Sequence, residues 1–292
     1  MNAVTSFGER LHGVFTARGR LCVGIDPHAS LLDRWGLDDS AAGAREFGLR
    51  VVGAASGRAG IVKPQVAFYE RHGSAGYAAL ERVLAEARDA GLLVIADVKR
   101  GDIGTSVDAY GEAWLRPGSS LESDAMTISA YQGLGSIESV MRRADAAGKG
   151  LFVLAATSNP EAVAIQRAVL QQSSREGDTV AAAICGGVAA WNAAREDAAD
   201  RPMGSIGVVL GATVDLAASG IDTSADPVTP TLPVLAPGFG HQGADVRDLD
   251  AIYGSLAAGV IVSESRSLLG EGPDGLAEAI VRRADEIGGA RV

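Results

Sequence analysis

The sequence contains little cysteine, and this scarcity limits the class of protein that it can encode. Only two cysteines, Cys22 and Cys185, occur in 292 residues. Two thiols cannot form the disulfide framework of a small secreted domain, and their spacing matches no metal-binding motif. They are typical of a protein whose buried thiols stay reduced. We therefore expect a cytoplasmic location.

A long apolar run is also missing from the sequence. Glu9 and Arg10 interrupt the N-terminal stretch, which therefore lacks the apolar core of a secretory signal. The stretch 179–194 contains no charged residue, but it consists mostly of alanine and glycine and is too short to span a bilayer. These features predict a soluble protein that does not interact with a membrane.

Positive charge is scarce relative to negative charge. The chain has 26 Lys and Arg residues against 36 Asp and Glu residues, a formal net charge of -10. Such a surface repels polyanions, so we expect no binding to nucleic acid. A small anionic substrate could still bind in a local basic pocket. Hydrophobic residues make up 47% of the chain, enough to form a large folded core.

Short apolar runs closed by Gly, Pro or Asp recur along the whole chain. They lie at 21–27, 60–65, 92–99, 124–131, 151–160, 205–213, 232–240 and 259–265. Runs that are almost continuously apolar are typical of parallel strands buried on both faces. Segments with helical periodicity lie between them, at 77–90, 136–147, 245–258 and 274–287. Eight such units predict an α/β fold, a single (β/α)8 TIM barrel.

No break in composition divides the chain, so we predict one domain over residues 1–292. Extra length falls in two insertions, at about 160–202 after the fifth strand and at about 212–230 after the sixth. A doubly wound open sheet is the competing fold. Eight regular units in one chain favour the barrel.

Charged residues end the second and third predicted strands, where barrel enzymes carry their active sites. Asp97 and Lys99 are two residues apart, so on a regular strand both point to the same face, and Val98 points toward the helices. Lys63 adds a second inward cation. A structural ion pair is the alternative interpretation. Neighbouring carboxylates would keep these lysines protonated, as proton donors or electrostatic clamps rather than Schiff-base nucleophiles.

Five motifs at successive strand ends resemble one enzyme family. ADVKRGDI at 96–103 carries the D-x-K-x-x-D signature of the orotidine 5'-monophosphate decarboxylase suprafamily. The decarboxylase motifs are VGIDP at 23–27, VKPQVAFYE at 62–70, TSNP at 157–160 and PGFGHQG at 237–243. The resemblance covers nearly the whole chain and is greatest to the longer bacterial (type 2) branch. It implies decarboxylation of orotidine 5'-monophosphate (OMP) to uridine 5'-monophosphate (UMP), the last step of UMP synthesis.

The resemblance also implies catalytic roles for four residues. Lys99 would deliver a proton to C6 of the pyrimidine as carbon dioxide leaves, and Asp97 would lie against the substrate carboxylate. Lys63 would bridge the ribose and Asp97. Asp102 would complete the site of a neighbouring subunit, which makes the expected protein a homodimer. The family needs no cofactor, and no sequence feature indicates a metal.

Substrate-binding residues follow from the same resemblance. Asp26 matches the aspartate that binds a ribose hydroxyl, and Ser158 matches the serine that contacts the pyrimidine. The family has a threonine four residues after the last motif aspartate, reaching the neighbour's ribose. Ser106 holds that position here and Thr105 precedes it, so either hydroxyl could make the contact. Both could instead cap the following helix.

The phosphate is expected after the last two strands, as is usual in barrels. Gln242 and Arg266 match the phosphate ligands of the family, and backbone amides around Ser265 would assist them. The guanidinium of an arginine suits a phosphate dianion because it presents a fork of N–H donors.

Four other interpretations compete with this one. PGFGHQG contains G-x-G-x-x-G, and Glu264 follows about twenty residues later, as in a dinucleotide-binding motif; only 28 residues then remain, too few for a Rossmann sheet. A magnesium-dependent sugar-phosphate lyase of the suprafamily would need a carboxylate where Lys63 stands. A Schiff-base aldolase would use Lys63 or Lys99 as its nucleophile. A non-catalytic phosphate-binding barrel would bind nucleotide without turnover.

Overall fold

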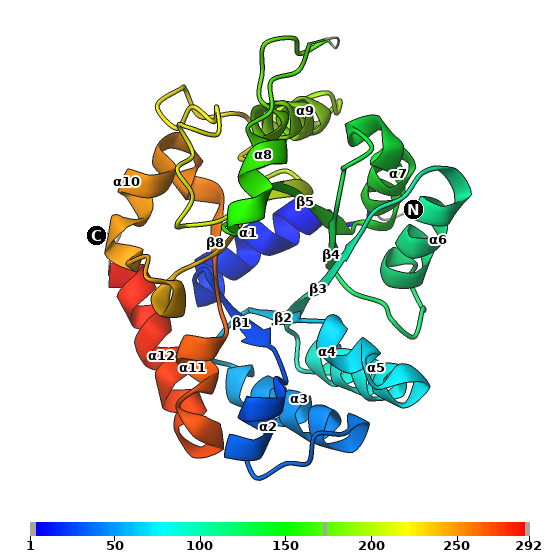
Figure 1. The fold of residues 1–292 in the computed structure, drawn as a ribbon, viewed down its shortest axis with the longest axis vertical. Helices are drawn as coiled ribbons and strands as arrows, with labels where there is room; N and C mark the ends of the chain where they lie inside the picture. Colours follow the sequence, from blue (N-terminus) through cyan, green and yellow to red (C-terminus); the bar gives the residue numbers. More distant parts are fainter. Residues whose placement is uncertain (1–3, 172–173, 290–292) are drawn as a thin grey trace.

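Eight parallel strands close into a barrel in the computed structural model of the chain, which describes residues 4–171 and 174–289. The strands follow chain order around the barrel, and pairing of the first with the last closes it. They are β1 Leu21–Ile25, β2 Ile61–Pro64, β3 Leu93–Arg100, β4 Ala125–Ile128, β5 Gly150–Ala156, β6 Ile206–Leu210, β7 Val234–Pro237 and β8 Val260–Glu264. Each predicted strand run overlaps one of them, so the predicted barrel is confirmed (Figure 1).

Helices surround the barrel (Figure 1). Those of the described residues are α1 Phe7–Arg18, α2 Ala29–Arg34, α3 Ala41–Ala55, α4 Ala67–Glu70, α5 Gly73–Asp89, α6 Gly104–Leu115, α7 Glu138–Ala147, α8 Val163–Gln166, α9 Val180–Ala193, α10 Leu249–Tyr253, α11 Arg266–Leu269 and α12 Gly272–Gly289. The segments predicted at 77–90, 136–147 and 274–287 correspond to α5, α7 with the 3-10 turn before it, and α12.

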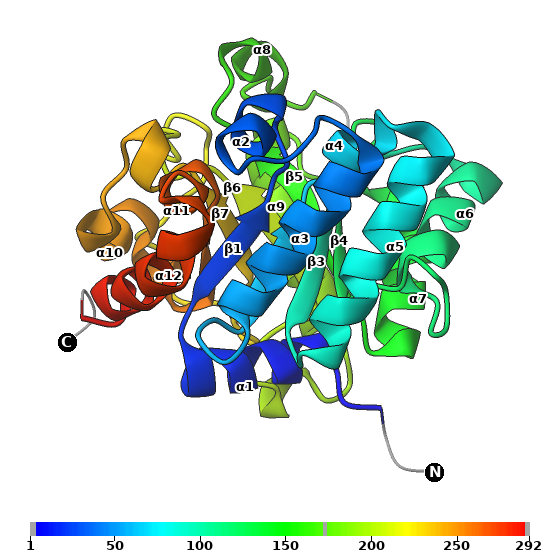
Figure 2. The same ribbon diagram turned by 90° about the horizontal axis from the view of Figure 1, so that it is seen from below.

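The helix α1 covers the end of the barrel where the strands begin, at the bottom of Figure 2. Its Phe7 and Leu11 are fully buried and belong to the cluster that fills this end of the barrel interior, with Cys22 and Phe152. Ser6 caps the helix, because its hydroxyl accepts a hydrogen bond from the Glu9 amide and its own amide donates one to the Glu9 carboxylate. The closed end therefore leaves the opposite end of the barrel for the site.

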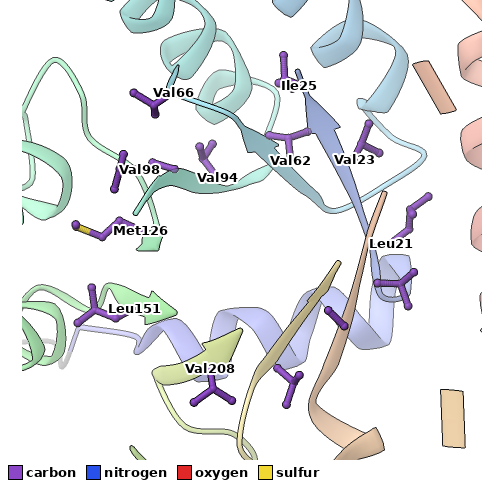
Figure 3. Close-up of a cluster of buried hydrophobic side chains, with 14 of the residues drawn as sticks. Leu21, Val23, Ile25, Val62, Val66, Val94, Val98, Met126, Leu151 and Val208 are labelled. Atoms are coloured by element: carbon purple, nitrogen blue, oxygen red, sulfur yellow. The ribbon is translucent and has the colours of Figure 1, made fainter. Parts of the chain in front are cut away.

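Side chains on the outer face of the strands form the larger core. Leu21, Val23 and Ile25 of β1 alternate with inward-facing residues and pack toward the helices. Figure 3 shows them with equivalent residues of neighbouring strands, among them Val62 and Val94. Burial on both faces explains why the strands read as continuous apolar runs in the sequence.

Helical structure departs from the prediction in two places. Residues 211–233, all described, connect β6 to β7 through turns without a helix, and Pro227, Pro230 and Pro233 interrupt this segment. The helix predicted at 245–258 is broken into α10 and flanking 3-10 turns. Gly254 breaks it because its φ is +49° and a Cβ there would lie 2.1 Å from the Thr223 carbonyl oxygen.

The segment 160–202 includes a helix of the barrel wall. α9 packs against β5 and β6, and Asn192 on α9 hydrogen-bonds both the amide and the carbonyl of Ile206. The short α8 precedes it and lies at the end of the molecule opposite α1 (Figure 2). Across residues 4–171 and 174–289, every helix is too short or too polar to cross a lipid bilayer.

Candidate functional site

The inner face of the barrel changes from apolar to charged along the strands. Every second residue of a strand points inward, so β2 presents Ile61 and then Lys63, and β3 presents Ile95 and then Asp97. Ile61 and Ile95 belong to the apolar interior. Lys63 and Asp97 line a cavity of about 290 Å³, with Gln65 just beyond β2. Strand periodicity thus brings the charges to the open end of the barrel.

Most of the predicted site residues line this one cavity. They are Asp26, Lys63, Asp97, Lys99, Ser158, Gln242, Ser265 and Arg266. They come from the ends of six strands, β1, β2, β3, β5, β7 and β8, that are spread along the sequence. The structure therefore brings these side chains together at one end of the barrel, as their positions at the strand ends predict.

Asp97 is the centre of the charged part of the cavity. Its side chain is 7% exposed, and four donors surround the carboxylate. Oδ2 accepts hydrogen bonds from Lys63 Nζ at 2.9 Å and Gln65 Nε2 at 2.8 Å. Oδ1 accepts from Lys99 Nζ at 2.5 Å and Thr127 Oγ1 at 2.9 Å. This bonding fixes both ammonium groups relative to one carboxylate.

Burial and charge oppose each other at the pair of Asp97 and Lys63. Burial alone would raise the pKa of Asp97, but the ammonium groups of Lys63 and Lys99 outweigh it and hold that pKa well below its usual range. Burial would lower the pKa of Lys63, but the carboxylates of Asp97 and Asp26 raise it above its usual value. Both residues are therefore charged at neutral pH.

The backbone at Lys99 is not that of a regular strand. Its φ is +47°, the only positive φ of a non-glycine residue in the described chain, and the pairing of β3 with β4 shifts between Ala96 and Arg100. Its amide donates to Thr127 Oγ1 at 2.9 Å. The prediction that Asp97 and Lys99 share a face is confirmed by their contact, although a bulge brings Lys99 there. Such strain at a non-glycine residue is typical of functional sites.

Asp26 ends β1 at the edge of the cavity. Its Oδ1 is buried and has no hydrogen-bond partner among the described residues. A buried carboxylate oxygen normally accepts at least one hydrogen bond. A hydroxyl group of a bound ligand could supply the missing donor.

Ser158 and Gln242 meet across the cavity. Ser158 follows β5 and Gln242 lies in the loop after β7, yet the Ser158 hydroxyl is 3.4 Å from Gln242 Oε1, which accepts its hydrogen bond. Ser265 and Arg266, in the turn after β8, line the cavity beside them. Polar side chains from the segments after β5, β7 and β8 thus line the same cavity as the two lysines.

Asp102, Thr105 and Ser106 do not line the cavity. Asp102 lies between β3 and α6 and accepts a hydrogen bond from the Ile103 amide. Thr105 and Ser106 are exposed in the first turn of α6, whose N-cap is Ile103 and makes no side-chain capping bond. The alternative prediction that these hydroxyls cap the helix is therefore wrong.

Sequence reasoning missed Gln65 and Thr127, which both hydrogen-bond Asp97. Strand periodicity could have identified Gln65, because it lies two residues after Lys63. Thr127 gave no such signal, since its role depends on the register between β3 and β4. His241 also lines the cavity, whereas the His28 ring contacts the Phe68 ring, with 4.1 Å between centroids and 56° between the ring planes.

Metal-binding side chains do not cluster in the described part of the chain. No group of three or more His, Cys, Asp or Glu residues there could hold a metal ion. The chemistry available in the cavity is that of two ammonium groups, one guanidinium, three carboxylates and several neutral hydrogen-bonding groups. Such a site can bind an anion and transfer a proton.

The chain matches one protein-family model, and it is similar over most of its length to proteins that share one name. The model described as the Orotidine 5'-phosphate decarboxylase / HUMPS family matches residues 19–278. A Salinispora tropica protein named orotidine 5'-phosphate decarboxylase is 47% identical over 269 residues, 92% of this chain and 91% of that protein. A Nocardioides protein of the same name is 46% identical over 287 residues, 96% of this chain and 98% of that protein.

Solved structures are similar over almost the whole chain. A Streptomyces avermitilis crystal structure has a TM-score of 0.88 and 46% identity, and the match covers 99% of this chain and 96% of the other. The structure of Leishmania donovani OMP decarboxylase has a TM-score of 0.73 and 28% identity, covering 98% of this chain and 99% of the other.

Proposed function

Because the chain belongs to the Orotidine 5'-phosphate decarboxylase / HUMPS family, we propose that its cavity binds OMP and that Lys99 donates a proton to C6 of the pyrimidine. The activity is decarboxylation of OMP to UMP and carbon dioxide, the last step of UMP biosynthesis. One observation carries the proposed mechanism. It is the buried Asp97 carboxylate held between the ammonium groups of Lys63 and Lys99.

In the proposed reaction, the bond between C6 and the substrate carboxylate breaks and its electron pair stays on C6. Lys99 transfers a proton from Nζ to C6, so a C–H bond replaces the C–C bond. The neutral lysine then regains a proton from solvent, to which 45% of its side chain is exposed. A fixed ammonium beside the developing charge supplies the electrostatic stabilisation that usually dominates catalysis.

Asp97 and Lys63 act on the bound substrate in this proposal. Asp97 lies against the substrate carboxylate and disfavours the ground state through like-charge repulsion. Lys63 bridges Asp97 and the ribose. The four hydrogen bonds to Asp97 support these roles, because they keep the carboxylate from turning away from the approaching substrate charge.

The remaining cavity residues bind the rest of the nucleotide. Asp26 accepts a hydrogen bond from a ribose hydroxyl, which its unpartnered Oδ1 supports. Ser158 contacts the pyrimidine, and Gln242, Arg266 and the amides around Ser265 bind the phosphate. Binding of the remote phosphate holds the base at the lysines and so contributes to catalysis.

A homodimer completes the site in the proposal. Asp102 reaches the cavity of the neighbouring subunit, together with the hydroxyl of Thr105 or Ser106. The position of all three outside their own cavity supports this arrangement. Ile103, the residue after Asp102, is 60% exposed, and Tyr131, which follows β4, is 75% exposed; both offer apolar surface to a partner.

The same reasoning leads to three further proposals. The chain forms one domain over 1–292, with insertions at about 160–202 and 212–230, and works in the cytoplasm. Catalysis uses no metal or organic cofactor, because the lysines and carboxylates supply the charge. A metal-dependent lyase is less well supported, since Lys63 rather than a carboxylate lies at the end of β2.

Replacement of Lys99 tests the proton-donor role. Purified protein is mixed with OMP and a chelator, and the ultraviolet change from substrate to product is followed. We expect rapid turnover by the native chain and a loss of more than about 10³-fold in kcat for Lys99→Ala, with UMP binding retained. Lys99→Arg keeps the positive charge but holds its proton too tightly, so it should remain inactive as well.

Either of two results would contradict the proposal. Appreciable turnover by Lys99→Arg would show that charge alone is enough and that Lys99 is no proton donor. Absence of turnover by folded native protein would point to a metal-dependent lyase or to a binding protein.

A further inference from the structure

A buried acid lies next to the proposed phosphate ligands. Glu264 is the last residue of β8, directly before Ser265 and Arg266, and it lines the same cavity. Its side chain is only 1% exposed. A carboxylate beside a binding site for a dianion weakens binding unless another group balances its charge.

Both oxygens of the Glu264 carboxylate have partners, on different elements. Oε1 lies 2.6 Å from Nε and 2.5 Å from Nη2 of Arg283, which is on α12. Oε2 accepts a hydrogen bond of 2.6 Å from the hydroxyl of Ser267, in the turn after β8. Arg283 thus balances the charge of Glu264, and Ser267 connects Glu264 to the residues that are proposed to bind the phosphate.

The loop after β7 also packs against this carboxylate. A Cβ at Gly240 would lie 2.9 Å from Glu264 Oε2 and 3.1 Å from Ser267 Cβ, and the φ of Gly240 is +68°. Only glycine combines this conformation with so close an approach. Gly240 belongs to the G-x-G-x-x-G sequence that resembled a dinucleotide-binding motif, and Glu264 is the acid that followed it.

We propose that Glu264 is a positioning residue for the 5'-phosphate, holding the loop 238–243 and the turn 265–267 together against α12. Arg283 cancels the charge of Glu264, so the dianion can bind beside it. The proposal rests on the proposed function, because it assumes that Gln242 and Arg266 bind the phosphate of OMP. It assigns selectivity for phosphorylated over phosphate-free ligands to an ion pair that does not touch the substrate.

The two partners should have unequal effects when replaced. Arg283→Gln leaves the Glu264 charge uncompensated beside the phosphate and should weaken UMP binding at least about 30-fold. Glu264→Gln keeps the shape of the side chain but replaces charge-assisted hydrogen bonds to Arg283 and Ser267 by weaker ones, so the turn after β8 is held less firmly and UMP binding should weaken about 5-fold. The double replacement removes the repulsion, so UMP should bind it more tightly than it binds Arg283→Gln.

The experiment compares inhibition of OMP turnover by UMP and by uridine, which lacks the phosphate. Inhibition constants are measured for the native chain and for the three variants. We expect UMP to bind less tightly to the variants and uridine to bind all four chains equally. Glu286→Gln is the control, because it removes only the exposed partner of Arg283 Nη1 and should leave both constants unchanged.

Selective weakening of UMP binding, largest in Arg283→Gln and partly recovered in the double variant, supports the proposal. Equal weakening of both inhibitors indicates a general structural role and overturns it, as does unchanged UMP binding. If Arg283→Gln does not fold, Glu264→Gln and the double variant still separate these outcomes. Failure of the native chain to turn over OMP would contradict the proposed function rather than this inference.

Discussion

Asp97 illustrates how single residues set the chemistry of the cavity. It is a buried carboxylate whose four hydrogen-bond donors come from β2, β3, β4 and the residue after β2. Lys99 reaches it only through a left-handed backbone conformation. The site is therefore organised before any substrate enters, and little rearrangement is required when charge develops.

The pKa shifts predict how the buried ion pair responds to pH. The pKa of Asp97 in the folded chain lies below the unfolded value of about 3.9, so its contribution to stability is present above about pH 4 and is lost as pH falls further. The pKa of Lys63 lies above the unfolded value of about 10.4, so its contribution is lost only as pH rises beyond about 10. Between these limits the contribution should be constant.

Asp97→Asn tests this expectation. We expect it to lower the free energy of unfolding by about 3 kcal/mol at pH 7, because Lys63 loses its principal partner. Urea denaturation at several pH values should give the same difference from pH 5 to 9 and a smaller one below pH 4. Glu46→Gln, which breaks an exposed pair with Arg50, should have almost no effect. A difference that varies strongly between pH 5 and 9 would contradict the assignment.

At the scale of elements, the strands could be predicted from sequence more reliably than the connections. Burial on both faces makes each strand a continuous apolar run, and all eight were predicted for that reason. The break at Gly254 was missed because it depends on contact with Thr223, which is distant in sequence. The bulge at Lys99 depends likewise on pairing with β4.

Asn192 supports a prediction about element packing. Its side chain is buried and bridges α9 to the first residue of β6, with bonds of 2.7 Å to the Ile206 carbonyl and 3.2 Å from its amide. Asn192→Ala should lower the free energy of unfolding by about 3 kcal/mol, since two buried backbone groups lose a partner. It should leave kcat unchanged, because Ile206 begins its strand at the end away from the cavity.

Thermal or urea denaturation and the OMP assay, applied to the same preparations, measure both effects. Glu278→Ala, an exposed substitution on α12, provides the comparison for stability. A large fall in kcat with unchanged stability would show that α9 influences the site in some other way.

At the scale of the whole molecule, the cavity forms one proposed catalytic unit with Asp102, Thr105 and Ser106, which lie outside it. Periodicity and motif order together predicted eight residues that line the cavity. The ion pair of Glu264 and Arg283 could not be predicted, because no local pattern links the end of β8 to the middle of α12. The proposed role of Asp102 involves a neighbouring subunit, so the contacts within the described residues of one chain do not test it.

Mixing two inactive variants tests whether Asp102 is shared. Lys99→Ala and Asp102→Ala chains should each be inactive as homodimers. After subunit exchange, each mixed dimer has one site with native Lys99 and native Asp102, so about a quarter of native activity should return. Labelled subunits verify that exchange has occurred. No recovery after verified exchange would mean that Asp102 works within its own subunit.

The exposure of Lys99 has a practical consequence. The chain has only three lysines, Lys63, Lys99 and Lys149. The side chains of Lys63 and Lys149 are 8% and 9% exposed, against 45% for Lys99. An amine-selective reagent should therefore modify one side chain per subunit, measurable by mass spectrometry, and UMP should protect it. The proposed proton donor would then serve as the attachment point for a covalent probe of site occupancy.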